Sequence, residues 1–215
     1  MTLEAVLFDL DGTLINSEPD WLVVEEAVMA WLGGPWGPEH QDVVVGGSLW
    51  GCVDYMIAVA GSEVDRVEVA ERLLEGMAER MSAGLTVMPG AKELLNGVQA
   101  AGIPIALVTS TVRRLADLAI DALGRDFFAV TVTGDEVEHT KPHPEPYLRA
   151  AGLLGVNPAR CVVLEDSPTG VAAGEAAGCV VVAVPCVVPI PAAPTRTIVR
   201  SLADLDVAAL RALMG

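Results

Sequence analysis

Five runs of mainly apolar residues recur along the chain, separated by stretches with helical spacing. The runs occupy residues 5–8, 103–108, 129–133, 161–164 and 179–184. Strands that are apolar on both faces and alternate with helices are typical of a parallel sheet covered by helices on each side. The pattern therefore predicts an α/β fold with a doubly wound parallel sheet.

Prolines and glycines mark the ends of the helices that this pattern predicts. We expect helices over residues 89–102, 112–123, 144–154 and 167–177. Pro89 and Pro144 can begin two of them, because proline fits the first turn of a helix. Each of the four predicted helices ends at or just before a glycine, Gly102, Gly124, Gly155 or Gly178, which can terminate it in the left-handed conformation.

The segment between the first and second predicted strands is much longer than a crossover needs, and its pattern is helical throughout. Ser17 can cap a helix that ends near Leu32, and Ser62 followed by Asp65 can open another that ends near Met81. The sequence thus predicts a core domain of residues 1–14 and 85–215 with an inserted all-helical domain of residues 15–84. Two short crossing points would join them as a hinge.

Composition narrows the class of protein. The chain has 215 residues, 52% hydrophobic and 20% charged, which indicates a globular protein rather than a disordered one. A net charge of −16 argues against nucleic-acid binding. The mean hydropathy is +0.48, yet each apolar stretch ends before the roughly 18 residues of a membrane helix, so we expect no membrane partner. Four cysteines without metal-binding spacing and no leader pattern predict a cytoplasmic location.

Two carboxylates stand one residue apart at the end of the first strand. Asp9 and Asp11 can reach one ligand, because residues i and i+2 of an extended segment share a face and Gly12 permits a sharp turn beyond them. This geometry suits a nucleophile beside an acid/base, with a hard cation screening the pair. The alternative is that one carboxylate merely caps a turn.

Three further polar segments follow or lie near predicted strands. Thr109 can donate to a phosphate oxygen, helped by backbone N–H groups of the next helix, or it can simply cap that helix. Lys141 precedes Pro142, and it can act as a point charge or as a solvated loop residue. Glu165 and Asp166 can bind a metal or cap the helix after the fourth strand.

With these segments in this order, the chain resembles phosphohydrolases of the haloacid dehalogenase superfamily. The resemblance is to the subgroup with a helical cap inserted after the first motif, which includes β-phosphoglucomutase and related phosphatases. It implies a Rossmann-like core in which the strands ending at Asp9, Thr109 and Asp166 are neighbours at the centre of the sheet.

The resemblance also implies a role for each motif. Asp9 would attack phosphorus to give an aspartyl-phosphate, and Asp11 would protonate the leaving oxygen and then deprotonate water. Lys141 would span the phosphate and Asp9, while Thr109 and Ser110 would bind the phosphate. Mg²⁺ is the expected cofactor. Its implied ligands are the Asp9 side chain, the Asp11 backbone carbonyl and Asp166, with Glu165 ligating directly or through water.

The absence of lysine from the predicted cap, and of Lys and Arg from its loop 46–51, limits the reactions that the protein can catalyse. Residues 15–84 contain no lysine, which excludes the Schiff-base chemistry of the related phosphonoacetaldehyde hydrolases, and Asp11 and Asp166 argue against dehalogenation. A sugar phosphomutase must hold a second phosphate, and the resemblance places cations for this in the loop 46–51. That loop has no Lys or Arg, which favours a phosphatase.

Two more residues are candidates for contact with the leaving group. Trp50 can offer an apolar wall, although an aromatic residue at helical spacing is more often part of the core. Arg113, or its neighbour Arg114, can reach a distal oxygen, although a helix-surface arginine is equally consistent. His139 and His143 flank Lys141 and are interpreted as exposed loop residues.

These observations together predict a Mg²⁺-dependent phosphatase that acts on a small organic phosphate monoester, such as a sugar phosphate, through an aspartyl-phosphate. The alternatives are a sugar phosphomutase and a non-catalytic binding protein on the same scaffold. We expect a small phosphorylated metabolite as partner, no nucleic acid or membrane, and a monomer or weak homodimer.

Overall fold

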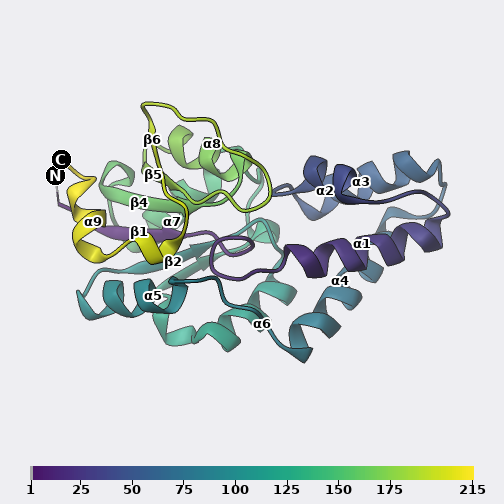
Figure 1. The fold of residues 1–215 in the computed structure, drawn as a ribbon, viewed down its shortest axis with the longest axis horizontal. Helices are drawn as coiled ribbons and strands as arrows, with labels where there is room; N and C mark the ends of the chain where they lie inside the picture. Colours follow the sequence, from purple (N-terminus) through teal and green to yellow (C-terminus); the bar gives the residue numbers. More distant parts are fainter. Residues whose placement is uncertain (1) are drawn as a thin grey trace.

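Within residues 2–215, which the computed structural model describes, six strands form one parallel sheet in the order β3-β2-β1-β4-β5-β6 (Figure 1). The strands are β1 Ala5–Phe8, β2 Ile105–Val108, β3 Val130–Val132, β4 Cys161–Glu165, β5 Val180–Ala183 and β6 Arg196–Ile198. The first five confirm the predicted runs. Strand β6 was not predicted, because this short edge strand is only partly buried and lacks an apolar run.

Side chains of the central strands alternate between two apolar layers. Val6 and Phe8 point into the layer covered by α5 (Ala91–Ala100), α6 (Arg113–Leu123) and α9 (Val207–Ala212). Ala5 and Leu7 point into the layer covered by α7 (Glu145–Leu154) and α8 (Pro168–Ala176). Because both faces are covered, β1, β2 and β4 are buried along their whole length, as the doubly wound fold predicts.

Four helices follow β1 and stand at one end of the sheet (Figure 1). They are α1 Glu18–Leu32, α2 Pro38–Val44, α3 Leu49–Ala60 and α4 Arg66–Ala83. We call residues 15–84 the cap segment; its division from the core as a separate domain stays a prediction. The predicted helices α1 and α4 are present, whereas Trp50, which was expected in a loop, lies in the first turn of α3.

Two short chain segments connect the cap segment to the core, one at each end, and they pair with each other. Ile15 bridges Val87 in antiparallel fashion, and the backbone N–H of Asn16 donates to the Thr86 carbonyl at 2.8 Å. The crossing points therefore lie side by side, as predicted. The Ser17 side chain does not cap α1, which corrects the sequence interpretation, because its hydroxyl donates to Asp11 instead.

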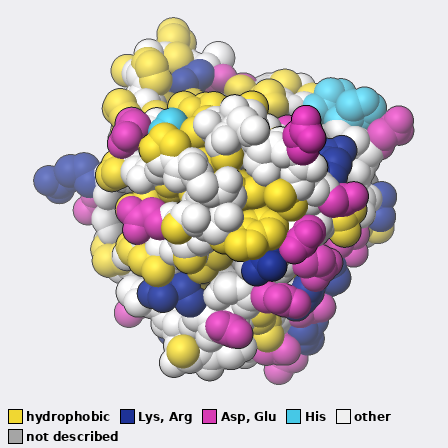
Figure 2. All heavy atoms as spheres, turned by 90° about the vertical axis from the view of Figure 1, so that its right-hand side faces the viewer, with side chains coloured by type: hydrophobic (Ala, Val, Ile, Leu, Met, Phe, Trp, Pro, Cys, Tyr) yellow, Lys and Arg dark blue, Asp and Glu magenta, His cyan; other side chains and the backbone are white. Residues whose placement is uncertain are grey.

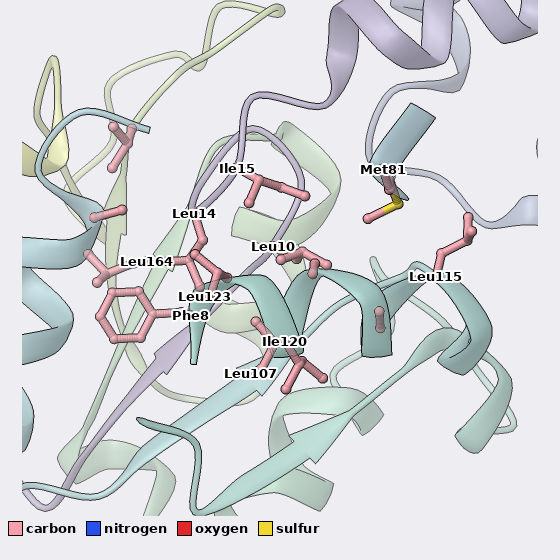
Figure 3. Close-up of a cluster of buried hydrophobic side chains, with 14 of the residues drawn as sticks. Phe8, Leu10, Leu14, Ile15, Met81, Leu107, Leu115, Ile120, Leu123 and Leu164 are labelled. Atoms are coloured by element: carbon pink, nitrogen blue, oxygen red, sulfur yellow. The ribbon is translucent and has the colours of Figure 1, made fainter. Parts of the chain in front are cut away.

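The cap segment and the core share one hydrophobic cluster. Helix α4 packs against α6 as well as against α1 and α3. Figure 3 shows Met81 of α4 on the same side of the cluster as Leu115 of α6, with Phe8 and Leu10 closer to the sheet. Apolar packing thus holds the cap segment over the carboxyl edge of the sheet. No helix within residues 2–215 is long and apolar enough to cross a membrane.

Candidate active site

The central strands deliver the candidate residues to one pocket. Asp9 follows β1, Thr109 follows β2 and Asp166 follows β4, and β1 lies between the other two strands. All three residues line the pocket, together with Asp11 and Lys141. The carboxyl ends of neighbouring parallel strands meet at one edge of a sheet, at the point where the strand order reverses. The structure therefore brings the four predicted segments together.

Lys141 is the cation at the centre of this pocket. Its ammonium donates to Asp9 Oδ1 at 2.6 Å, to Glu165 Oε1 at 2.5 Å and to the Val108 carbonyl at 2.8 Å. Only 4% of Lys141 is exposed. Burial alone would lower its pKa, but the carboxylates of Asp9 and Glu165 outweigh burial and hold the pKa above its usual range. Lys141 is thus a permanent charge at the site.

Carboxylates outnumber this single ammonium. Burial raises the pKa of Asp9 to about 8, Lys141 opposes the rise, and the nearby Glu165 and Asp11 add to it. Burial and the Asp9 charge raise the pKa of Asp166 well above its usual range. Asp9, Glu165 and Asp166 each offer an oxygen within 4.8 Å of the others. Three crowded, buried carboxyl groups are a donor set that fits a hard divalent cation.

The Asp11 side chain is held by two hydroxyl groups. Ser17 donates to Asp11 Oδ1 at 2.6 Å, and Thr111 donates to Asp11 Oδ2 at 2.6 Å. These donors come from the start of the cap segment and from the loop after β2. Both hydroxyls were missed by the sequence analysis, because small polar residues beside helices are ordinarily interpreted as caps. They fix the orientation of Asp11 beside Asp9.

Glu165 is occupied as a support for Lys141. It is fully buried, and its Oε1 accepts from both Lys141 and the Tyr147 hydroxyl, the latter at 2.6 Å. The Ser167 hydroxyl donates to its other oxygen at 3.2 Å. Tyr147 was not predicted as a site residue, because an aromatic residue on a helix is ordinarily taken for core. Its hydroxyl makes it part of the charge network.

Gly12 permits the close approach of the first and fourth motifs. A Cβ at Gly12 would lie 2.1 Å from Asp166 Oδ2, and the glycine has a φ of +76°. A side chain at this position would displace the Asp166 carboxylate and strain the backbone. The glycine therefore allows Asp166 to sit against the turn that carries Asp11.

The hydroxyl groups after β2 differ in how they are used. Thr109 Oγ1 accepts from the backbone N–H of Thr111 at 3.0 Å. Ser110 lines the pocket, and its buried hydroxyl has no hydrogen-bond partner among the described residues. A buried polar group without a partner is costly. An oxygen-rich ligand in the pocket would satisfy Ser110.

Arg113 and Trp50 do not reach the pocket, in contrast to the sequence hypothesis. Arg113 donates to Glu136 at 2.7 Å and to Thr131 at 3.0 Å, beside β3. The Trp50 ring is 44% exposed, with the Arg66 guanidinium 4.6 Å from its centroid. Both residues lie in the first turn of a helix, and the face they occupy there directs each to a surface partner.

Other charged residues and the two histidines flanking Lys141 lie at the surface, and the exposure of the histidines is as predicted. Arg66 pairs with Asp54 at 3.0 Å, and both side chains are largely exposed. His139 and His143 are exposed and lie with their ring centroids 4.6 Å apart. Arg114 pairs with Glu71 of α4 at 3.0 Å, which links the core to the cap segment rather than to a ligand.

Buried and partly buried polar residues from the cap segment line the other half of the pocket. Glu18 and Glu25 are one heptad apart on α1, with Trp21 between them on the same face. Burial raises the pKa of Glu18 to about 8 and that of Glu25 to about 7. Gln41 donates to the Glu18 carbonyl at 2.8 Å. The sequence analysis missed Glu18, Glu25 and Gln41, although the heptad spacing of the two glutamates was an available signal.

The loop between α2 and α3 closes onto the core. Gly46 has a φ of +70°, and a Cβ there would lie 2.6 Å from the Ser167 hydroxyl oxygen. The backbone of the cap segment at Gly46 therefore lies directly against the Ser167 side chain of the core, beside the pocket. Figure 2 looks onto the cap end of the molecule, where hydrophobic side chains occupy the middle of the face and acidic ones gather along one side.

A parallel sheet that presents paired aspartates, a lysine and a further acidic pair to a helix-covered pocket defines a class of α/β enzymes. The chain belongs to the haloacid dehalogenase-like hydrolases, whose family model matches residues 3–178. The named relatives include several phosphatases, so the enzyme is of the phosphatase type.

Individual relatives resemble nearly the whole chain. Hexitol phosphatase A of Escherichia coli is 37% identical over 185 residues, which cover 86% of this chain and 84% of that protein. Validoxylamine A 7'-phosphate phosphatase of Streptomyces hygroscopicus is 36% identical over 182 residues, with coverage of 81% and 82%.

Among solved structures, CbbY from Rhodobacter sphaeroides in complex with phosphate has a TM-score of 0.87 and 26% identity. The match covers 97% of this chain and 99% of that one. The β-phosphoglucomutase of Clostridium difficile has a TM-score of 0.84 at 23% identity and covers 99% of this chain and 97% of its own, which shows a shared fold.

Proposed function

We propose that the protein is a Mg²⁺-dependent phosphatase that hydrolyses a small organic phosphate monoester through an aspartyl-phosphate. The observation that carries the proposal is the buried contact of Lys141 with Asp9, 2.6 Å long, beside an Asp11 carboxylate held by two hydroxyls. A nucleophile, an adjacent acid/base and a phosphate-binding cation are the groups that a two-step phosphoryl transfer requires.

In the first step, an Asp9 oxygen attacks phosphorus, and the bond between phosphorus and the substrate oxygen breaks. Asp11 gives its proton to that oxygen, which leaves as an alcohol. In the second step, Asp11 takes a proton from water, and the water oxygen attacks phosphorus. The bond between phosphorus and Asp9 breaks, and inorganic phosphate leaves. The Ser17 and Thr111 hydroxyls hold Asp11 for both proton transfers.

Charge and shape at the site support the remaining roles. Lys141 would bind a phosphate oxygen while it holds Asp9, and Ser110 would donate its free hydroxyl. Mg²⁺ would be held by Asp9, the Asp11 carbonyl and Asp166, where it would neutralise the charge of the phosphate and the carboxylates. Glu165, whose oxygens are bonded to Lys141, Tyr147 and Ser167, would act mainly as a support for Lys141.

The relatives point to a sugar phosphate or a similar metabolite as substrate, since they include a hexitol phosphatase and a validoxylamine A 7'-phosphate phosphatase. A phosphomutase is the alternative, because it shares this scaffold. It would need cations for a second phosphate, and Lys141 is the one Lys or Arg among the described residues that line the pocket. That charge count supports a phosphatase.

We place the reaction in the cytoplasm, which four free cysteine thiols support, and expect a monomer or a weak homodimer. The test is a panel of phosphorylated metabolites and p-nitrophenyl phosphate, assayed with Mg²⁺ and with a chelator. We expect phosphate release that stops on chelation. Conversion of a hexose 1-phosphate to the 6-phosphate, dependent on a bisphosphate primer and without net phosphate release, would overturn the proposal in favour of a mutase.

A further inference from the structure

We propose that Glu25, together with Glu18, makes the cap half of the pocket selective for a leaving group that is uncharged and rich in hydroxyl donors, and that it rejects a second anionic group. The inference rests on the proposed phosphatase function and deepens it. It assigns specificity to the buried Glu25 carboxyl group and the partly buried Glu18 carboxyl group, which take no part in the chemical steps.

The charge of the pocket is the first observation. The acidic side chains that line it are Asp9, Asp11, Glu18, Glu25 and Asp166. Lys141 is the only cation among the described lining residues, and Asp9 and Glu165 already share it. A second phosphate or a carboxylate on the leaving group would therefore meet carboxyl groups and no counter-charge in a desolvated site.

The hydrogen bonding of the two carboxyl groups is the second observation. Glu25 accepts from Trp36 Nε1 at 3.0 Å and from the weak donor Cys52 Sγ at 3.9 Å. The Glu18 side chain accepts from Gln41 at 3.3 Å. Each carboxyl group can accept more bonds than these. Sugar or polyol hydroxyls would supply the missing donors, whereas a phosphate or carboxylate has none to offer.

Cations of the cap segment are engaged elsewhere, which is the third observation. Arg66 pairs with Asp54, Arg72 with Glu68 and Arg80 with Asp20, all at the surface. None of these arginines lines the pocket. A rearranged side chain from this set would have to give up its partner and cross the packed helices to reach a distal anion.

Apolar side chains complete this half of the pocket. Trp21, Leu49 and Leu74 line it next to the two glutamates. An aromatic or aliphatic wall suits the C–H faces of a sugar chain, while the carboxyl groups accept from its hydroxyls. The combination fits a neutral polyol better than a compact anion such as a carboxymethyl group.

A matched pair of substrates tests the charge selectivity directly. Sorbitol 6-phosphate and 6-phosphogluconate share their chain and differ at the first carbon, which carries a hydroxyl in one and a carboxylate in the other. At about pH 9, above the raised pKa values of both Glu18 and Glu25, the two carboxyl groups are largely ionised. There we expect kcat/KM to favour sorbitol 6-phosphate by about tenfold or more, the worth of a lost hydrogen bond plus repulsion. Equal or inverted values would overturn the inference.

Variants then assign the selectivity to the residues. Glu25→Gln keeps the shape and removes the charge, so the ratio of the two kcat/KM values should fall several-fold, mainly through KM for 6-phosphogluconate. Glu18→Gln should act in the same direction. Glu26→Gln is the matched control, because Glu26 is the exposed neighbour on the same helix. An unchanged ratio in both pocket variants, or an equal change in Glu26→Gln, would overturn the assignment.

Binding separates this inference from the proposed function. Asp9→Asn protein can be titrated with both ligands by calorimetry, with circular dichroism to confirm folding. If wild-type protein hydrolyses p-nitrophenyl phosphate but prefers 6-phosphogluconate, the inference fails and the function stands. If no ester is hydrolysed, the function fails, and the preference in binding still decides the inference: tighter sorbitol 6-phosphate supports it, and equal or weaker binding overturns it.

Discussion

Lys141 donates a hydrogen bond of 2.6 Å to Asp9 although 132 residues separate the two along the chain. Both side chains are buried, and the same ammonium also binds Glu165, the last residue of β4. One lysine thus ties together the ends of the two central strands β1 and β4. The contact organises the pocket before any ligand arrives, which is the pre-organisation that electrostatic catalysis needs.

Removal of the nucleophile tests the central role of Asp9. Asp9→Asn should lower kcat by about 10³-fold or more while the fold is retained, because an amide cannot attack phosphorus to form the acyl phosphate. Asp11→Asn should form phosphoenzyme but hydrolyse it slowly, which mass spectrometry of quenched samples would detect. Asp42→Asn, at an exposed site on α2, is the control and should retain full activity. Undiminished turnover in pure Asp9→Asn protein would rule out the assignment.

The Tyr147 hydroxyl offers a test of the network behind Lys141. Tyr147→Phe removes a buried donor at 2.6 Å from Glu165, so the free energy of unfolding should fall by about 1–3 kcal/mol. Because Glu165 supports Lys141, kcat should also fall, with KM little changed.

Urea unfolding and steady-state kinetics would measure both effects of Tyr147→Phe. Tyr55→Phe is the matched control: its hydroxyl bonds His40 in the cap segment at 3.0 Å, outside the network. If the two variants lose the same activity, Tyr147 has no specific link to the site.

We expect the contact between the cap segment and the core at Ser167 to depend on Gly46. Gly46→Ala would place a methyl group 2.6 Å from the Ser167 hydroxyl oxygen, so the loop could no longer rest on the core. We expect kcat/KM to fall about tenfold or more, because water and substrate are then less well controlled.

Gly61→Ala separates this effect from backbone strain. Gly61 also has a positive φ, +61°, yet nothing lies within 4 Å of the added Cβ. Both variants should lose some stability, whereas only Gly46→Ala should lose activity in an assay with p-nitrophenyl phosphate. Similar activity in the two variants would show that the contact does not govern catalysis.

The buried carboxyl groups predict a pH dependence that Mg²⁺ should alter. Burial raises the pKa of Asp9 from 3.8 to about 8, so the folded protein retains a proton that the unfolded chain releases across this interval. The stability that this retained proton contributes is fully present below pH 3.8, the ordinary pKa of the group, and is lost as the pH rises through about 8, its pKa in the folded protein. Without a divalent cation, stability contributed by Asp9 should therefore decline as pH rises toward 8, and Asp166 should act in the same direction.

A bound cation replaces that proton. Mg²⁺ should raise the Tm. The increase should be larger near pH 8 than at about pH 6, because fewer protons compete with the cation for the carboxyl groups at the higher pH. Thermal unfolding with Mg²⁺ and with a chelator measures this. Asp166→Asn should diminish the increase. An increase that is the same at both pH values, or is retained in full by Asp166→Asn, would contradict the assigned metal site.

Periodicity and motif order predicted the core well, because buried parallel strands are apolar on both faces wherever the chain runs through the centre of a sheet. The limits of β1 match the prediction, and β4 extends it by one residue to Glu165. The three-residue edge strand β6 was missed, since an edge strand is stabilised mainly by its neighbour's backbone. Helix α3 begins where a loop was expected, with Ser48 as its cap.

The sequence by itself determined the first five strands and the order of the motifs, because buried parallel strands leave an apolar pattern in the chain. The meeting of Asp9, Thr109, Lys141 and Asp166 followed from the resemblance of these motifs to the family, which implied the strand order. Tertiary structure decided which polar side chains face the pocket. It turned Arg113 and Trp50 to surface partners and brought in Tyr147, Glu18 and Glu25. The physical reason is that helical spacing reports which residues share a face, whereas the neighbour across that face comes from distant parts of the chain.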